Sequence, residues 1–145
     1  GRTAMIPLFR ERRVQKIYRA VVAGSWPDPE GTITRPLDGK TAITRVQVLS
    51  RSRQATQLQL ELPTGRTHQI RRHLAGRRHP VLGDTRYAGA EAAAALVPGL
   101  RGQLLHAERI AFTDPFENAA VRVRAPLPAS FRQALRALGL AGRGA

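Results

Sequence analysis

The residues best suited to chemistry in this chain lie in one short basic segment, Gly65-Arg66-Thr67-His68-Gln69-Ile70-Arg71-Arg72-His73. Four long side chains within it, those of Arg66, Gln69, Arg71 and Arg72, can each donate hydrogen bonds to a phosphate or a base edge. A packed core does not need such a density of long donors, whereas a nucleic-acid site does. The segment therefore indicates a protein that binds nucleic acid.

The composition also favours a polyanionic partner. The 145 residues include 24 arginines and lysines against 10 acidic residues, which gives a net charge of +14, and the only lysines are Lys16 and Lys40. An excess of this size favours RNA or DNA, although genomic composition explains the arginine bias about as well. A membrane is a poorer partner, because the basic residues are spread over many segments. No apolar run reaches the ~20 residues that span a bilayer.

Metal and redox sites have little support in the residue types. The chain has no cysteine, which excludes disulfides and thiolate zinc sites and is compatible with a reducing compartment such as the cytoplasm. His68 and His73 are five residues apart, so they lie on different faces of a helix, and no carboxylate stands at ligand spacing. We therefore expect no metal site.

The elements that position the basic segment follow from hydrophobic periodicity. The clearest is a strand over residues 55–62, in which Thr56 and three leucines alternate with polar residues, as in a sheet with one buried face. Thr67 is expected to N-cap a helix that ends near Gly76. Residues from Gly139 onward are expected to fray. Further helices are expected over 3–13, 91–97 and 130–138, strands over 16–23, 42–50, 104–113 and 120–125, a loop over 24–31 and an extended stretch over 32–40.

This order of elements predicts the fold class. Helices and strands are mixed along the chain and successive strands are close in sequence, which is typical of an α+β fold with a mixed, largely antiparallel sheet flanked by helices. The length suits a single domain. The sequence contains no internal repeat and no linker that would divide it.

Four motifs in order along the chain resemble those of the RluA-like family of RNA pseudouridine synthases. One of these motifs alone would be weak evidence for the family, but the occurrence of all four in the same order is strong evidence. The resemblance covers about residues 9–127 and implies that residues 1–145 form part of the catalytic domain of such an enzyme. The motifs are Lys16-Ile17-Tyr18-Arg19-Ala20, Gly65-Arg66-Thr67-His68-Gln69-Ile70-Arg71, His79-Pro80-Val81-Leu82-Gly83-Asp84-Thr85-Arg86-Tyr87 and Leu104-Leu105-His106-Ala107.

The resemblance implies roles for individual residues. Tyr18 matches the tyrosine that stacks on the target base, and Arg66 matches the arginine that pairs with the catalytic aspartate. Leu105 matches an apolar residue that lines the base pocket, a position that ordinary strand packing explains nearly as well. Helix capping alone would explain the presence of a threonine at position 67. The other residues expected to shape the site or contact RNA are Lys16, Thr67, His68, Gln69, Arg71 and Arg72.

One residue of the family pattern is missing. The nucleophilic aspartate of the family lies in an H-R-L-D segment upstream of the tyrosine strand, and residues 1–15 contain no aspartate. Asp38 follows the tyrosine strand and is interpreted as a turn residue, and Asp84 lies in a Gly-Asp turn that supports its loop. The chain by itself is therefore expected to have no pseudouridine synthase activity.

The resemblance implies a longer, cytoplasmic enzyme that isomerises uridine to pseudouridine in ribosomal or transfer RNA without a cofactor. The alternative is a non-catalytic RNA-binding module or a truncated remnant that lacks the nucleophile, and the upstream sequence distinguishes the two. An arginine-rich structural protein of the ribosome would explain the charge but not the four motifs. The absence of upstream strands would leave a sheet edge open, which favours pairing with another chain.

Overall fold

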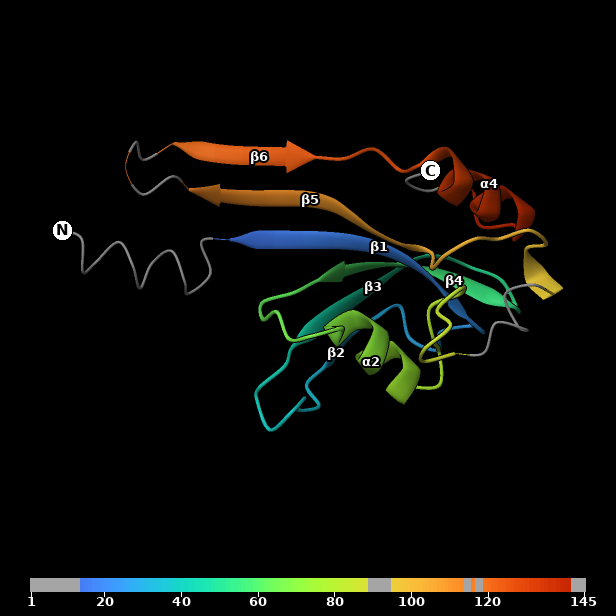
Figure 1. Ribbon diagram of the computed structural model, residues 1–145, viewed down its shortest axis with the longest axis horizontal. Coiled ribbons are helices and arrows are strands. Elements are labelled where there is room, and N and C mark those ends of the chain that lie inside the picture. The colour runs from blue at the N-terminus through green and yellow to red at the C-terminus, as the bar shows by residue number, and fades with distance from the viewer. Residues whose placement is uncertain (1–13, 89–94, 114–115, 117–118, 142–145) are drawn as a thin grey trace.

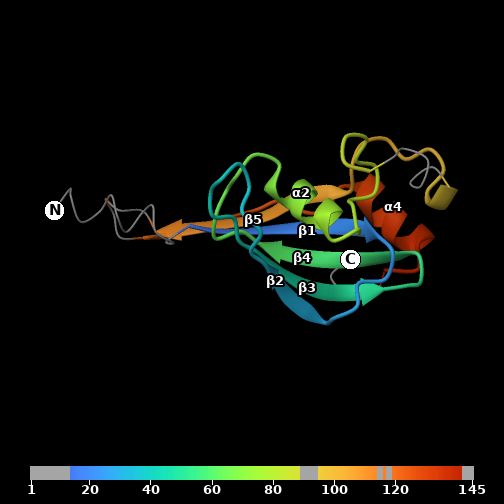
Figure 2. The same ribbon diagram turned by 90° about the horizontal axis from the view of Figure 1, so that it is seen from below.

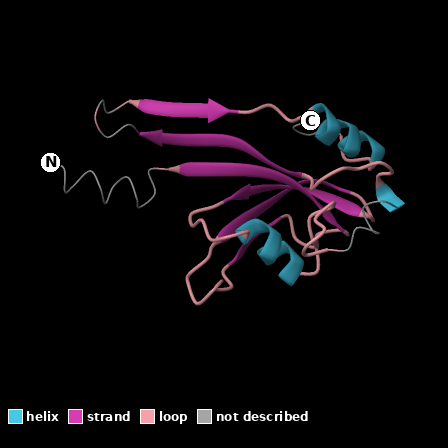
Figure 3. Cartoon of the chain, viewed as in Figure 1, coloured by secondary structure: helices cyan, strands magenta, loops and turns pink. Residues whose placement is uncertain are grey.

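The computed structural model describes residues 14–88, 95–113, 116 and 119–141, which form a six-stranded sheet flanked by helices α2 and α4 (Figures 1 and 3). The strands lie side by side in the order β2-β3-β4-β1-β5-β6. Figure 2 shows β1 and β4 at the centre of this sheet. The bounds are β1 Gln15–Ala23, β2 Glu30–Ile33, β3 Thr44–Arg51, β4 Ala55–Glu61, α2 Gln69–Gly76, β5 Leu105–Thr113, β6 Ala120–Arg124 and α4 Ala129–Ala137.

The predicted α+β class and most of the predicted elements are confirmed. All five pairings between neighbouring strands are antiparallel. Five strands and the last helix fall within two residues of their predicted bounds. Strand β2 is the exception, because the sequence predicts only a loop and an extended stretch there. The helix predicted over 3–13 lies outside the described residues, as does most of the one predicted over 91–97.

The two helices cover opposite faces of β1 (Figure 1). Ala20 and Val22 pack in the core beneath α2, where Ile70 and Leu74 are buried as their helical spacing requires. Val21, between them in the strand, packs in a second core beneath α4. The alternation of neighbouring residues between two cores is the period of two expected of a strand that is buried on both sides. Tyr18 therefore shares the α2 face with Ala20.

The prediction of a single buried face for residues 55–62 is wrong at Gln57, whose side chain is fully buried on the α4 face. Its oxygen accepts a hydrogen bond from Arg19 Nη1 at 2.7 Å, and its Nε2 donates to Ser50 Oγ at 2.9 Å. Ser50 in turn donates to the carbonyl of Leu140 at 2.8 Å. Leu140 is fully buried, so the tail expected to fray from Gly139 is packed at least that far.

The hairpin of β5 and β6 forms one outer side of the described sheet, and β2 forms the other. Ile110 and Val123 are directly opposite one another in this hairpin and are 39% and 56% exposed. Exposed apolar side chains beside an open strand edge favour association with another strand. Pairing with another chain stays a prediction. None of the helices in the described ranges is long and apolar enough to cross a membrane.

Candidate functional site

Tyr18 stands near the middle of the sheet, opposite Leu60 of β4 and Ala107 of β5. Its ring is half-buried and packs against the core beneath α2. Leu105 of β5 lies opposite Ala20, packs against the same core and is also half-buried. An aromatic ring and an aliphatic side chain on one half-exposed surface offer the apolar contact that a nucleobase needs.

Lys16 and the loop after β4 lie together at the end of the same strands. A Cβ added to Gly65 would be 3.2 Å from the Lys16 ammonium nitrogen, so this cation lies against the loop just before Arg66. The Leu62 N–H donates to the Lys16 carbonyl at 3.2 Å, which extends the pairing of β1 and β4 toward the loop. The structure thus brings the strand that carries Tyr18 next to the loop that carries Arg66.

Arg66 is half-buried and anchored at one point. Its Nε donates to the carbonyl of Thr41 at 2.7 Å. Within the described part of the chain, its two terminal nitrogens make no hydrogen bond or ion pair. A guanidinium held in this way keeps a pair of donors that suit a carboxylate or a phosphate.

Gln69 holds the loop that carries Arg66. Its oxygen accepts from the Thr64 hydroxyl and from the Arg66 N–H, both at 2.9 Å. Its Nε2 donates to the Ile43 carbonyl at 2.7 Å and to Thr44 Oγ1 at 3.0 Å. The side chain is 2% exposed, so it positions Arg66 from inside and has almost no surface for the direct RNA contact that the sequence suggests.

A buried histidine continues this network. His73 Nε2 donates to the carbonyl of Arg35 at 2.8 Å, so its Nδ1 is the acceptor for the Thr44 hydroxyl, also at 2.8 Å. This assignment follows from the partners, because a carbonyl only accepts. Burial lowers the pKa of His73, and the nearby positive charges of Arg35, Arg72 and Arg77 lower it further. The hydrogen bond to the Arg35 carbonyl raises this pKa, but the net shift is downward. A neutral His73 therefore links α2 to β3.

The prediction that Thr67 caps α2 is wrong. His68 is the N-cap residue, with a φ of 48°, and no side chain caps the helix. The loop is instead closed by the Gln69 N–H, which donates to the Arg66 carbonyl at 3.1 Å, while Thr67 is exposed. His68 Nδ1 lies 3.0 Å from the hydroxyl of Tyr87. The C-cap is Arg77, one residue beyond the predicted Gly76.

Arg71 joins α2 to the loop that contains Asp84. Its Nε and Nη2 each donate to an Asp84 oxygen at 2.9 Å. Asp84 is 1% exposed and also accepts the N–H groups of Arg86 and Tyr87 at 3.0 and 3.2 Å. Burial raises the pKa of Asp84, but Arg71 and these two N–H groups outweigh it, so the pKa is lowered overall. Asp84 is thus a buried loop support, as the Gly-Asp turn indicates.

Sequence reasoning did not select Tyr87 as a site residue. Its ring centroid is 5.0 Å from the Arg71 guanidinium carbon and 5.5 Å from that of Arg86. The signal was present, because Tyr87 ends a motif in which it follows an arginine and is the only other tyrosine besides Tyr18. Cation–π contacts of this kind fix the loop beside His68 and Arg71.

Arg72 makes an exposed ion pair with Asp38. The two guanidinium nitrogens donate to the carboxylate at 2.9 and 3.0 Å, and the hydrogen bonds from Arg72 lower the pKa of Asp38. Asp38 has a φ of 54° in a turn closed by two hydrogen bonds between Leu37 and Lys40, which is the turn position expected for it. An exposed pair contributes little to stability, so Arg72 can exchange Asp38 for another anion at little cost.

The family model described as RNA pseudouridylate synthase matches residues 3–76. "Ribosomal large subunit pseudouridine synthase D" of Xylella fastidiosa is 35% identical over 160 residues, which cover 95% of this chain and 48% of that protein. "Ribosomal large subunit pseudouridine synthase C" of Vibrio cholerae is 36% identical over 141 residues, with coverages of 88% and 45%. The chain thus spans about half the length of these curated relatives.

Two solved human structures share the fold. "RNA Pseudouridylate Synthase Domain Containing 1" matches with a TM-score of 0.68 and 25% identity, over 91% of this chain and 63% of that one. "RNA Pseudouridylate Synthase Domain Containing 4" matches with a TM-score of 0.72 and 23% identity, over 92% and 66%.

Within the described ranges, no group of three histidine or acidic side chains is placed to hold a metal ion.

Proposed function

Because this chain belongs to the RNA pseudouridylate synthase family, we propose that residues 1–145 form part of the catalytic domain of a cytoplasmic enzyme that isomerises uridine to pseudouridine in RNA. The observation that carries the proposal is the convergence of Tyr18, Leu105 and the Arg66 loop at one face of the sheet. The names of the bacterial relatives favour ribosomal RNA over transfer RNA as the substrate.

The reaction sets requirements that these side chains meet in part. The C1′–N1 bond of uridine breaks, the base rotates, and the ring is rejoined through C5, with no cofactor. The base must first leave its stack, at a cost of a few kcal/mol. Stacking of the base on Tyr18 stabilises the flipped-out state by about 1–3 kcal/mol, and Leu105 supplies an apolar wall of the pocket. Lys16 is placed to bind a flanking phosphate.

Arg66 is proposed to hold the catalytic aspartate. Its terminal nitrogens are available and its Nε is fixed by the Thr41 carbonyl, so the guanidinium is oriented before a carboxylate arrives. An aspartate acting as nucleophile or base must be ionised, and a neighbouring guanidinium favours that state. His68, Thr67, Arg71 and Gln69 then act around Arg66, chiefly by shaping and fixing its loop.

Replacing Tyr18 by leucine tests the stacking role. We expect Tyr18→Leu to weaken binding of an RNA hairpin with a uridine-rich loop by about 5-fold to 150-fold, since stacking on the ring contributes about 1–3 kcal/mol. Tyr18→Phe keeps the ring and should bind within about twofold of the original chain. Fluorescence anisotropy of a labelled hairpin measures both.

The matched pair also controls for folding. Both replacements are apolar and leave the core contacts of Tyr18 largely filled, so the two variants should unfold at similar urea concentrations. The salt dependence of RNA binding should not change in either, because no phosphate contact is lost. Equal RNA affinity of the leucine and phenylalanine variants would reject the base-stacking role and with it the proposed site.

The chain by itself is expected to release no tritium from 5-tritiated uridine in bulk RNA. The aspartates that the structure places near the site are already engaged: Asp84 is buried against Arg71, and Asp38 is paired with Arg72 in a turn. Asp84 has almost no exposed surface from which to reach a nucleotide, and in the described part of the chain neither carboxylate is paired with Arg66. Tritium release is measured beside the Xylella fastidiosa synthase as a positive control, and robust turnover by this chain would show that one of its own residues is the nucleophile.

A further inference from the structure

Three arginines share one face of the β5–β6 hairpin. Arg109 lies directly opposite Arg124, and Ala111 lies opposite Arg122. Because side chains two residues apart in a strand are on the same face, Arg109, Arg122 and Arg124 form one group, called here the hairpin arginines. Arg109 is also opposite Ile17 of β1, the residue before Tyr18. The hairpin arginines therefore lie on the face of the sheet opposite Tyr18.

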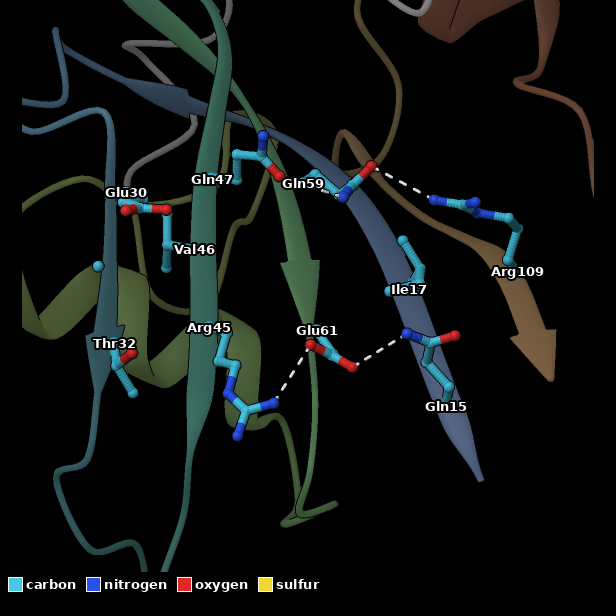
Figure 4. Close-up of a pocket in the computed structure, with 11 residues that line it drawn as sticks. Gln15, Ile17, Glu30, Thr32, Arg45, Val46, Gln47, Gln59, Glu61 and Arg109 are labelled. Carbon is cyan, nitrogen blue, oxygen red and sulfur yellow. Dashed lines mark hydrogen bonds and ion pairs between the residues drawn. The ribbon is translucent and has the colours of Figure 1, made fainter. Parts of the chain in front are cut away.

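The hairpin arginines line a hollow of about 470 Å³ that has no acidic side chain in its wall. Gln15 and Ile17 of β1 form its other side, and Ile110, Ala111 and Val123 of the hairpin complete its lining. Gln15, Ile17 and Arg109 also line a neighbouring hollow of about 580 Å³ over β2, β3 and β4 (Figure 4). In that second hollow, Arg109 donates to Gln59 Oε1 at 3.4 Å, and Arg45 and Gln15 both donate to Glu61. Charge is thus balanced over β3 and β4 but not over the hairpin.

The positive charges of the hairpin are poorly compensated. Like charges directly opposite one another in a strand pair are destabilising. Among the residues that the structure describes, the side chains of Arg122 and Arg124 have no ion pair or hydrogen bond. Arg109 is 3.9 Å from a carboxylate oxygen of Glu108, whose other oxygen is bound by Arg19. An anion that lies among the three guanidinium groups would relieve this repulsion.

The surroundings favour RNA over a protein as the source of that anion. A protein interface has an apolar centre with few charged residues, whereas three arginines with Ala111 among them occupy this face of the hairpin. The larger apolar residues of the hairpin, Ile110 and Val123, border the hollow, but the alternation of the strands directs their side chains to the other face. Guanidinium groups with interspersed amides, such as that of Gln15, are the donors that bind phosphates and sugars in RNA complexes.

We propose that the hairpin arginines bind the phosphodiester backbone of the RNA substrate at a distance from the target uridine. The identity of the partner rests on the proposed function. Because β6 is an outer strand of the described sheet, RNA can pass around it from the Tyr18 face to the arginine face. Such contacts orient the RNA without reading its sequence. They extend the RNA footprint to a second side of the sheet.

The test removes the charge from two hairpin arginines of this chain. The double variant Arg122→Gln/Arg124→Gln is compared with Arg132→Gln/Arg136→Gln, which loses the same charge from exposed positions of α4. Binding of a labelled oligouridylate is measured between about 0.05 and 0.2 M salt, where each phosphate contact contributes about −0.7 to the log–log slope for single strands. The hairpin variant should therefore have a slope shallower by about 1.4 and an affinity roughly tenfold lower at about 0.15 M salt.

The controls separate this inference from the proposed function. Arg122→Lys/Arg124→Lys should keep the slope of the original chain, and the α4 variant should change it little. The inference about the hairpin would be overturned if the hairpin glutamine variant bound RNA like the original chain, or if the α4 variant lost as much affinity. The proposed function would not be affected, because a loss of RNA affinity in Tyr18→Leu at constant salt slope would still support the stacking site. Failure of the original chain to bind RNA at all would overturn both.

Discussion

Replacing Gly83 by alanine should lower the free energy of unfolding by about 4 kcal/mol, which combines about 1–3 kcal/mol of backbone strain with the loss of neighbouring hydrogen bonds. Gly83 has a φ of 87°, and a Cβ added there would lie 2.0 Å from the carbonyl oxygen of Gly102. The obstacle is backbone rather than the end of a flexible side chain. Relief of the clash therefore requires the chain itself to move.

The segment that would move is built into the sheet. The Leu82 N–H donates to the Val21 carbonyl at 2.9 Å, the Leu104 N–H to the Leu82 carbonyl at 2.8 Å, and the Val21 N–H to the Leu104 carbonyl at 3.0 Å. Gly83 adjoins both this arrangement and Asp84. A displaced Gly83 would disturb the start of β5, where Leu105 lines the candidate base pocket, so weaker RNA binding should accompany the loss of stability.

Gly39→Ala supplies the matched control. Gly39 also has a positive φ, of 73°, but nothing lies within 4 Å of an added Cβ. Its replacement measures the cost of the backbone conformation alone, about 1–2 kcal/mol. Urea unfolding followed by circular dichroism measures both variants. If the two substitutions cost the same, the close approach to Gly102 is unimportant and the explanation given for Gly83 is wrong.

The sequence predicted the elements whose pattern is local. The leucines of β4 and the helical positions Phe131, Leu135 and Leu138 are buried at the predicted spacing, because burial of one face imposes a period on neighbouring residues. Gln57, which is buried on the other face of β4, is the departure from that period. The sequence did not predict strand β2, because three of its four residues are exposed and so show no hydrophobic pattern. Backbone pairing with β3 holds this strand in the sheet. The order of motifs, rather than any periodicity, singled out Tyr18, Arg66 and Leu105.

The buried polar residues were beyond local reasoning. Gln57 and Gln69 occupy positions that a polar side chain normally uses to face water. Gln57 is buried because Arg19, 38 residues away in the sequence, bonds to it, and Gln69 because the Ile43 carbonyl, 26 residues away, needs a donor. The same long-range bonds explain why Thr67 is not the cap, since the loop is fixed from inside by Gln69. Such pairs follow only from the register of the whole sheet.

A β-bulge beside Tyr18 places a buried ion pair on the α4 face. Ile17 pairs with Arg109 and Tyr18 with Ala107, so Glu108 is the additional residue on β5. Its carboxylate binds Arg19 Nη2 at 2.5 Å, and each residue is 5% exposed. A bulge redirects the side chain of its extra residue, and here it brings Glu108 to Arg19. The ion pair therefore joins the two strands that carry Tyr18 and Leu105 at the point where their register shifts.

Replacing Glu108 by leucine should cost about 3–5 kcal/mol of unfolding free energy, because it leaves the Arg19 charge buried beside Gln57 without its carboxylate. Replacing both partners, as Arg19→Met/Glu108→Leu, should cost much less, since neither charge then remains to be desolvated. Urea unfolding of both single variants and of the double variant measures their coupling. Equal destabilisation by Glu108→Leu and by the double variant would mean that packing at the bulge, rather than the unpaired charge, determines stability. If the ion pair also sets the strand register, the double variant will recover stability while its RNA affinity stays reduced, because the bulge that places Tyr18 opposite Ala107 is no longer fixed.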